Sequence, residues 1–335
     1  MTRCERVIAA VNHQDTDIVP YSIGFTREER AKVAAYLGDD HFMEKIGNHI
    51  TGAYFGATTT EVRPGYFADE FGVVWNRTVD KDIGVVDALH FEEPDMSLYT
   101  FPEVDEAAIR RGIEGMLASK GDAFGFAEIG FSMFERAWTL RGMENLLIDM
   151  IEEPEFVDAL LDAVLAYNLK VMDIALEYPI DGFHFGDDWG QQAGLITGPT
   201  LWRRFIKPRM AAMYGKAKAK GLIISQHSCG DIHEIFDDLI DIGLNIYQTF
   251  QPEIYDIRAV KAEYGSRLTF WGGLSTQRLL PYATPAEIKA KAAEIIGVMG
   301  AGGGYIAGPT HGMPDDIPAE NAVALIEALR DQPRR

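Results

Sequence analysis

The chain has 335 residues, of which 47% are hydrophobic and 24% are charged, and its formal net charge at pH 7 is −20. This length suffices for one large α/β domain or two smaller ones, and the composition is ordinary for a soluble globular enzyme. The acidic balance argues against nucleic acid and anionic membranes as partners, because both are bound through clustered lysines and arginines.

The use of cysteine indicates a reducing compartment. Cys4 and Cys229 are far apart in the sequence and form no framework of pairs. The N-terminal stretch MTRCERVIAAVNHQDTD becomes polar too soon for a signal peptide, and no apolar run approaches membrane-spanning length. We therefore expect a cytoplasmic protein.

Two helices and one strand are expected before residue 40. Residues 2–12 have a helical pattern, residues 19–24 have the apolar core and turn of a first strand, and a helix follows over 26–37 and ends near Gly38. Residues 50–100 hold alternating, β-rich segments with several turn signals. We interpret them as an irregular β-containing insertion near the mouth of the domain.

Helices and apolar strands alternate regularly after residue 100. VDEAAIRRGIEGMLASKG predicts an amphipathic helix, DAFGFAEIG a strand, and residues 143–178 a long helical pair. Five strand candidates follow: DGFHFGDDWG, GLIISQHSCG, GLNIYQTFQP, RLTFWGGLST and GGYIAGPTHGM. Their spacing of roughly 20 to 40 residues is that of βα units in a parallel sheet.

The ends of these strands distinguish two kinds of α/β fold. Eight βα units would close into a (β/α)8 TIM barrel, whereas fewer would give an open, doubly wound sheet. In each late unit the polar residues follow the strand, as in GDDW, HSCG, QTFQP, GGLST and PTHG. Barrel enzymes build their sites from several strand ends, while an open sheet uses one switch point. We therefore predict a single TIM-barrel domain over residues 1–335.

A metal site is the first functional hypothesis. His227 and Cys229 are two residues apart at a strand end, so their side chains project from the same face. Imidazole and thiolate suit zinc, which needs a third ligand, and His311 at the end of the last strand is the best candidate. Cysteine is also among the most buried residue types, so simple packing is the competing interpretation. A Cys–His nucleophilic pair is disfavoured, because i and i+2 neighbours rarely face each other.

Paired acids follow another strand. Asp187 or Asp188 could orient a substrate, supply a metal ligand or hold a proton, and His311 is a further catalytic candidate. Alternation along the strand means that only one of the two acids faces the barrel axis, and a cap or turn role is the alternative.

Aromatic and polar residues near the strand ends are the candidates for substrate binding. The predicted pocket residues are Trp189, Tyr247, Gln251, Trp271 and Glu128. Glu135 is a weaker candidate, because it could begin a helix as surface charge. His184 lies inside a strand and is expected in the core.

Two motifs are set aside. The glycine-rich stretch 300–305 precedes a strand instead of joining a strand to a helix, so a helix end and tight turn explain it better than a phosphate loop. Asp231 and His233 begin like the Asp-x-His-x-x-Gly signature of cobalamin binding, but Phe236 stands where glycine is needed. We expect a helix start there, with Asp231 as its cap.

Nearly the whole chain resembles the uroporphyrinogen decarboxylase superfamily. The resemblance is densest over residues 181–323 and rests on DGFHFGDDWGQQAGLITGPTLWRRFIKPRM, HSCG, YGSRLTFWGGLSTQRLLPYATPAEI and GGGYIAGPTHGMPDDIPAENAVALIEAL. It implies a (β/α)8 barrel. The superfamily contains cofactor-free decarboxylases of a tetrapyrrole and cobalamin-linked methyltransferases.

The resemblance favours the methyltransferase branch. The decarboxylases carry an Arg-Gln-Ala-Gly-Arg segment that grips substrate carboxylates, and the corresponding VPYSIGFTREERAK has no such motif. The methyltransferases carry a zinc site of the form His-x-Cys followed later by Cys. His227 and Cys229 match its first half, while His311 stands at the later position and also coincides with a histidine of the decarboxylases.

The resemblance therefore implies a zinc-assisted methyltransferase that moves a methyl group between a small O- or N-methylated substrate and a corrinoid protein. The corrinoid is expected on that partner protein, and a homodimer is allowed for. Two alternatives stay open. One is a decarboxylase-like lyase that acts on a carboxylated substrate through Asp187 or Asp188 and His311, and the other is a non-catalytic barrel that binds a small ligand.

Overall fold

The central feature of the fold is a curled sheet of parallel strands. The computed structural model describes residues 1–55, 60–79, 81 and 83–334. Among these residues, seven strands form one sheet, in the order β1 (Ile50–Tyr54), β6 (Phe124–Ile129), β7 (Gly182–Gly186), β10 (Ile223–His227), β11 (Ile246–Phe250), β12 (Thr269–Leu274) and β13 (Tyr305–Pro309). All of their pairings are parallel. The prediction of an α/β fold with a parallel sheet is confirmed.

The first predicted strand, over residues 19–24, is irregular. Isolated parallel bridges join Tyr21 to Ala307 and Phe25 to Met313 beside β13. On the other side, the backbone N–H of His49 donates to the carbonyl of Tyr21 at 2.9 Å, just before β1. Pro20 has no N–H to give to a ladder. The described sheet thus has seven strands and not eight, so the complete TIM barrel of the prediction is not confirmed.

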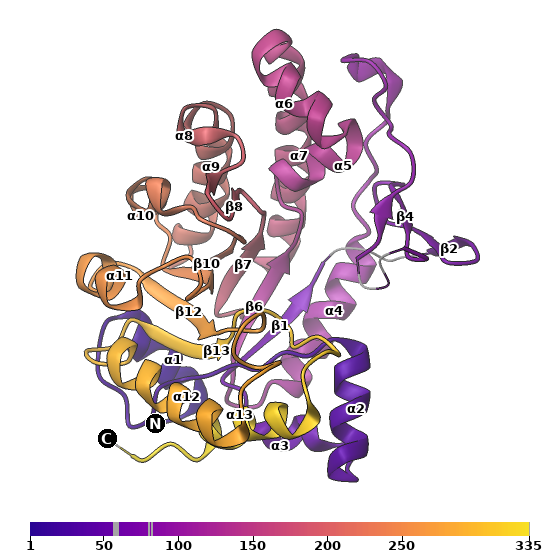
Figure 1. Ribbon diagram of the computed structural model, residues 1–335. Helices are drawn as coiled ribbons and strands as arrows, with labels where there is room; N and C mark the ends of the chain where they lie inside the picture. The colour runs from indigo at the N-terminus through magenta and orange to yellow at the C-terminus, as the bar shows by residue number, and fades with distance from the viewer. Residues whose placement is uncertain (56–59, 80, 82, 335) are drawn as a thin grey trace.

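Helices cover the outer face of the curled sheet (Figure 1). They are α1 (Arg3–Val11), α2 (Arg27–Leu37), α3 (Phe42–Ile46), α4 (Glu106–Ser119), α5 (Phe134–Arg141), α6 (Met143–Glu152), α7 (Pro154–Ala175), α8 (Gly198–Leu201), α9 (Lys207–Lys218), α10 (Phe236–Ile242), α11 (Ile257–Tyr264), α12 (Pro285–Met299) and α13 (Ala319–Arg330). Capping residues set their limits: Thr2 caps α1 in a capping box with Glu5, and Gly38 ends α2 at φ 65°. The helices predicted over 2–12, 26–37 and 143–178 are confirmed.

The predicted insertion over residues 50–100 is smaller than expected. Its first residues form β1 of the central sheet, because Ile50 and Ala53 pack into the protein interior. The insertion proper is a four-stranded antiparallel sheet of β2 (Thr60–Arg63), β3 (Tyr66–Ala68), β4 (Val74–Asn76) and β5 (Val85–Val86). Residues 56–59, 80 and 82 of the predicted segment lie outside the described residues.

A buried ion pair fixes this small sheet to the main body. Arg136 of α5 donates to a carboxylate oxygen of Asp69 at 2.6 Å, and both side chains are almost fully buried. Asp69 also accepts N–H groups from Phe71, Val73 and the indole of Trp75. This hydrogen bonding holds the insertion beside the carboxyl ends of β1 and β6.

Side chains fill the inside of the curl. Phe124 and Phe126 of β6 point inward with Ile246 and Ile306, and Val7 of α1 packs against the same cluster. A second, larger cluster lies between the sheet and the helices. Because these apolar side chains fill the inside of the curl, the polar functional groups lie beyond the carboxyl ends of the strands. In the described part of the chain, no helix combines the length and apolarity needed to cross a membrane.

Candidate functional site

Three potential metal ligands meet at the carboxyl end of the sheet. His227 ends β10, Cys229 follows two residues later, and His311 follows β13. The Cys229 sulfur lies 2.9 Å from Nε2 of His311 and 3.5 Å from Nε2 of His227, and the ligand atoms of all three residues are within 4.8 Å of one another. The sequence prediction that His311 lies close to the His227–Cys229 pair is therefore met geometrically.

The donor set fits a tetrahedral zinc ion. Bonds of about 2.3 Å to sulfur and about 2.0 Å to nitrogen place tetrahedral S and N donors about 3.5 Å apart. The observed sulfur–nitrogen separations of 3.5 and 2.9 Å need only small side-chain shifts. The two imidazole rings meet edge to face with centroids 5.6 Å apart, so neither ring blocks the other. The three residues would leave a fourth coordination position open.

Neighbouring residues orient His227. Its Nδ1 is hydrogen-bonded to the amide oxygen of Gln248, which leaves Nε2 free for a ligand role. Nε2 lies 3.3 Å from Oδ1 of Asp188, and the same oxygen accepts the backbone N–H of Cys229 at 2.7 Å. Burial opposes ionisation here, but the contact with His227 lowers the pKa of Asp188. Burial lowers the pKa of His311 to about 4, so its imidazole is neutral at pH 7.

Tyr247 and Gln251, predicted as pocket residues, instead support the loop that carries Cys229. The Tyr247 hydroxyl is fully buried and donates to the carbonyl of Ser228 at 3.0 Å, while the Gln251 amide oxygen accepts the N–H of Gly230 at 2.9 Å. Gly230 has φ 78°, and a Cβ there would lie 2.3 Å from Gly190. Glycine is therefore required where this loop turns.

The two neighbouring acids have different surroundings. Asp187 is fully buried and accepts the N–H groups of Met133, Phe134 and Glu135 at the start of α5, at 2.8 to 3.2 Å. It also accepts the indole N–H of Trp189 at 2.5 Å. Its side chain is fully engaged in holding the start of a helix, whereas Asp188 lines a cavity. The geometry gives Asp187 a structural role in place of the predicted catalytic one.

The predicted aromatic pocket residues are not among the cavity walls. Trp189 is buried, and its ring meets Trp202 at 5.3 Å between centroids. Trp271 lies inside the curl, where its ring is 6.5 Å from Phe126 and 5.6 Å from His184. Neither ring is among the described lining residues of the cavity.

A cavity of about 240 Å³ adjoins the metal-ligand cluster. Glu128, the fifth predicted pocket residue, lines it together with Asp188 and His227. The other described lining residues are Tyr54, Ile83, Ile129, Gly130, Phe131, Glu135, His184 and Gly186. The walls thus come from β1, β6, β7 and β10, from residues that follow these strands, from the start of α5, and from Ile83 of the insertion.

Three of these residues were undervalued or missed from the sequence. His184 was expected in the core, and its ring does contact Phe126 and Trp271, yet it also lines the cavity and bonds Ser225 at 2.9 Å. Tyr54 was assigned to the predicted insertion. It pairs with Glu128 in the parallel ladder of β1 and β6, and the sequence could have indicated this pairing only if β1 had been recognised as a strand of the central sheet. Glu135 is at the helix start as expected, but it faces the cavity.

Burial shifts the acid–base properties of the cavity. It raises the pKa of Glu128 from 4.5 to about 7, and the described residues show no hydrogen bond to this carboxyl group. Burial, together with the neighbouring carboxylates of Asp188 and Asp187, holds the pKa of Glu135 well above its ordinary value. These carboxyl groups crowd one small space whose described lining contains no lysine or arginine, and whose His227 is paired with Asp188 at 3.3 Å.

Replacing Glu128 with glutamine should stabilise the protein in alkaline solution. A carboxyl group whose folded-state pKa is raised costs stability as the pH rises above its ordinary value of 4.5, and the cost is complete above about 7. At pH 8.5 we expect the free energy of unfolding of the Glu128→Gln variant to exceed that of the unsubstituted protein by about 1 to 3 kcal/mol. At pH 4.5 we expect almost no difference. The expected gain is kept small because water in the cavity screens the carboxylate. Thermal denaturation at both pH values measures this difference.

The exposed Glu103 provides the matched control, because Glu103→Gln removes a carboxylate with a side chain 91% exposed. Its unfolding midpoint should follow that of the unsubstituted protein at both pH values. Equal destabilisation of the Glu128 variant at both pH values would show that the Glu128 carboxylate has a stabilising partner.

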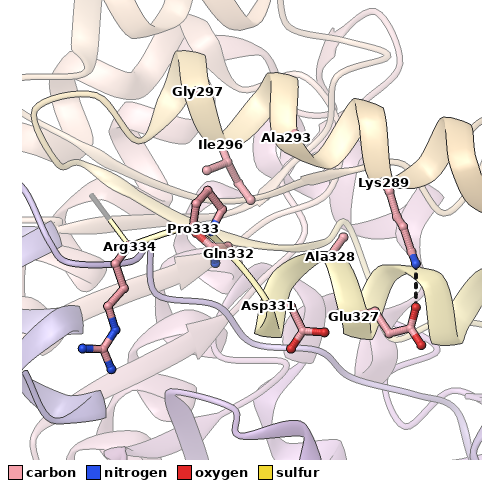
Figure 2. A pocket seen from close by; sticks show the side chains of 10 residues that line it. All are labelled: Lys289, Ala293, Ile296, Gly297, Glu327, Ala328, Asp331, Gln332, Pro333 and Arg334. Atoms are coloured by element: carbon pink, nitrogen blue, oxygen red, sulfur yellow. Dashed lines mark hydrogen bonds and ion pairs between the residues drawn. The ribbon is translucent and has the colours of Figure 1, made fainter.

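Another cavity, of about 470 Å³, lies far from these residues in the fold, along α12, the end of α13 and the C-terminal residues (Figure 2). Lys289 and Glu327 form an ion pair of 2.6 Å at its edge. None of the predicted site residues lines it. The predicted site residues that line a described cavity are those of the smaller cavity, beside the metal-ligand cluster.

Together, the curled parallel sheet and the polar groups at its carboxyl end define an α/β protein with a candidate site at the strand ends. A family model described as "Uroporphyrinogen decarboxylase (URO-D)" matches residues 108–332, more than half of the chain. The chain therefore belongs to the uroporphyrinogen decarboxylase family, whose superfamily members include decarboxylases and methyltransferases. The predicted family resemblance is confirmed.

Individual relatives are distant. The chain is 22% identical to a uroporphyrinogen decarboxylase of Cellvibrio japonicus over 182 residues, which are 54% of this chain and 50% of that protein. It is 24% identical to a uroporphyrinogen decarboxylase of Coxiella burnetii over 190 residues, 54% of this chain and 49% of that protein. The matches thus span about half the length of these curated relatives.

A solved structure has a similar fold over the whole length. A "methyltransferase from Methanosarcina mazei" superposes with a TM-score of 0.71 and 17% identity, and the match covers 99% of this chain and 98% of that one. At this identity the similarity shows the fold alone.

Proposed function

We propose that this protein is a metal-assisted methyltransferase that moves a methyl group between a small methylated substrate and a corrinoid carried by a partner protein. The observation that carries the proposal is the meeting of His227, Cys229 and His311 beside a small cavity at the carboxyl end of the sheet. The similarity in fold to the methyltransferase from Methanosarcina mazei supports it.

The cavity is poorly suited to a tetrapyrrole with many carboxylates. Its volume is about 240 Å³, and no lysine or arginine occurs among the described lining residues. Glu128, Glu135 and Asp188 would repel anionic groups of a substrate. The family's decarboxylase activity is therefore the weaker candidate for this chain.

The chain's own residues would prepare the site. His227, Cys229 and His311 would hold a zinc ion, with Gln248 fixing the orientation of the His227 ring. When bound, the ion would supply a Lewis acid for a polar group of the substrate or for a thiol. Asp188 fixes the Cys229 backbone by accepting its N–H at 2.7 Å.

The remaining parts of the proposal concern partners and location. Phe236 occupies the glycine position of the cobalamin signature, and His233 begins a short helical turn, so we assign the corrinoid to another protein. Methyl transfer would break the bond between the methyl carbon and its heteroatom, and the electron pair would remain on the heteroatom. We also propose a cytoplasmic location and keep homodimer formation as a hypothesis.

Methyl transfer to reduced cobalamin tests the proposed function. The zinc-loaded protein should accelerate the conversion of cob(I)alamin to methylcobalamin, followed by absorbance, with at least one donor from a panel of methoxy compounds and N-methylated ammonium salts. Removal of zinc by a chelator should abolish the acceleration, and added zinc should restore it.

Zinc-loaded protein that receives the same chelator already saturated with zinc controls for effects of the chelator itself. Decarboxylation of a small acid that is insensitive to the chelator would support the lyase alternative, with Asp188 and His311 as its acid–base groups. Background rates with every donor would support a ligand-binding protein.

A further inference from the structure

We propose that the small cavity selects a substrate whose methyl group is attached to a positively charged nitrogen, a methylated ammonium cation of about the size of choline. This inference rests on the proposed methyl transfer, and it assigns the chemical class of the methyl donor or acceptor. It follows from the charge, walls and size of the cavity bounded by Glu128, Glu135 and Asp188.

The carboxyl groups reach the cavity from three separate elements. Glu128 is in β6, Glu135 in the first turn of α5, and Asp188 follows β7. The Asp188 carboxylate is held by His227 and the N–H of Cys229, whereas Glu128 has no hydrogen bond or counter-charge among the described residues. An unpartnered buried carboxylate is stabilised by a bound cation, because the cation replaces the lost hydration.

The guanidinium beside this cavity cannot serve as that cation. Arg136 has its charge centre 5.6 Å from the Phe131 ring, but its two terminal nitrogens are bonded to Asp69 at 2.6 Å and to Glu70 at 3.2 Å. The buried pair with Asp69 fixes it under the small antiparallel sheet. His227, a basic lining residue, is paired with Asp188 at 3.3 Å, so Glu128 is the carboxyl group left without a described counter-charge for a ligand to supply.

An organic cation fits better than a metal ion. In the part of the chain that the structure describes, the cluster of His227, Cys229 and His311 is the one group arranged for a metal, and the three cavity acids do not form another. Aromatic rings line the same space: Tyr54 lies over Gly130, and the Phe131 ring packs 5.4 Å from Trp75. Aromatic faces together with carboxylates bind methylated ammonium groups, whose charge is spread over their methyl surface.

The size of the cavity limits the ligand. A volume of about 240 Å³ corresponds to about eight water molecules in the liquid. A trimethylammonium group with a short polar arm is small enough for this space. The polar arm would extend toward the metal-ligand cluster, because His227 belongs to both the cavity wall and that cluster.

The reaction balances without an acid catalyst. The methyl carbon would pass to the reduced corrinoid of the partner, whose electron pair would form the new cobalt–carbon bond while the carbon–nitrogen bond breaks and its electron pair stays on nitrogen. The nitrogen leaves as a neutral tertiary amine, and no proton is transferred. The positive charge is thereby lost from the cavity, so the carboxylates that attract the substrate release the product.

Isothermal titration calorimetry with two molecules of similar shape tests the inference. Choline and 3,3-dimethylbutan-1-ol differ in having nitrogen or carbon at the centre of the trimethyl group, and hence in charge. At pH 8, we expect the zinc-loaded protein to bind choline at least about tenfold more tightly than the neutral alcohol. Glu128→Gln should weaken choline binding by about tenfold and leave the alcohol unaffected, while Glu103→Gln should change neither.

Each result decides between the two proposals. Equal binding of choline and the alcohol, or binding of neither at millimolar concentration, would overturn the cation site, even if methyl transfer from a neutral methoxy donor were observed. Selective binding of choline with no methyl transfer from any donor would leave the cation site standing and refute the proposed function. Denaturation midpoints at pH 8 confirm that both variants are folded.

Discussion

Replacing Cys229 with alanine is expected to lower zinc affinity by more than about 100-fold and to abolish zinc-dependent methyl transfer. The sulfur is the donor common to both close contacts in the cluster, at 2.9 Å from His311 and 3.5 Å from His227. Removing a ligand should cost more than the 10- to 100-fold loss typical of removing a group that only orients one. Zinc content after dialysis against a competing chelator measures the effect.

Cys4 provides the control for this substitution. It lies in α1, where its backbone N–H donates to Asp122, and it has no part in the ligand cluster. Cys4→Ala should keep the zinc content of the unsubstituted protein, and Gln248→Leu should fall between the two because it releases the His227 ring. If Cys229→Ala retains zinc, the proposed metal centre is wrong.

Replacing Asp187 with alanine should cause the largest loss of stability. The substitution leaves three backbone N–H groups at the start of α5 and the Trp189 indole without an acceptor in a fully buried space. Unsatisfied buried donors cost about 1 to 3 kcal/mol each before relaxation, so a total of about 3 to 5 kcal/mol is expected. The midpoint of thermal unfolding should fall by about 5 to 10 °C.

The adjacent Asp188 makes a sharp comparison. Asp188→Asn keeps the shape of a side chain that lines the cavity and is 34% exposed, so its unfolding midpoint should stay within about 2 °C. It should nevertheless weaken zinc binding or methyl transfer, because it alters the surroundings of His227 and Cys229. A stable Asp187 variant paired with a destabilised Asp188 variant would reverse our assignment of the two acids.

The regular parts of the fold could be predicted because their signals are local. Apolar runs bounded by glycine predicted β7, β10, β11, β12 and β13, and capping residues such as Thr2 and Gly38 marked helix ends. β1 was assigned to the insertion, because ITGAY is short and mixes small and polar residues. Its place in the sheet depends on pairing with β6, more than 70 positions later in the sequence.

The sequence by itself determined the α/β class, the family and the pairing of His227 with Cys229, since strand alternation alone puts residues i and i+2 on one face. Only the tertiary structure decided that His311 comes within 2.9 Å of Cys229, because this contact joins different strand ends. It also separated Asp187, under the start of α5, from Asp188, in the cavity. Two adjacent aspartates look alike in the sequence. Their roles differ because different groups, distant in the sequence, pack around each of them.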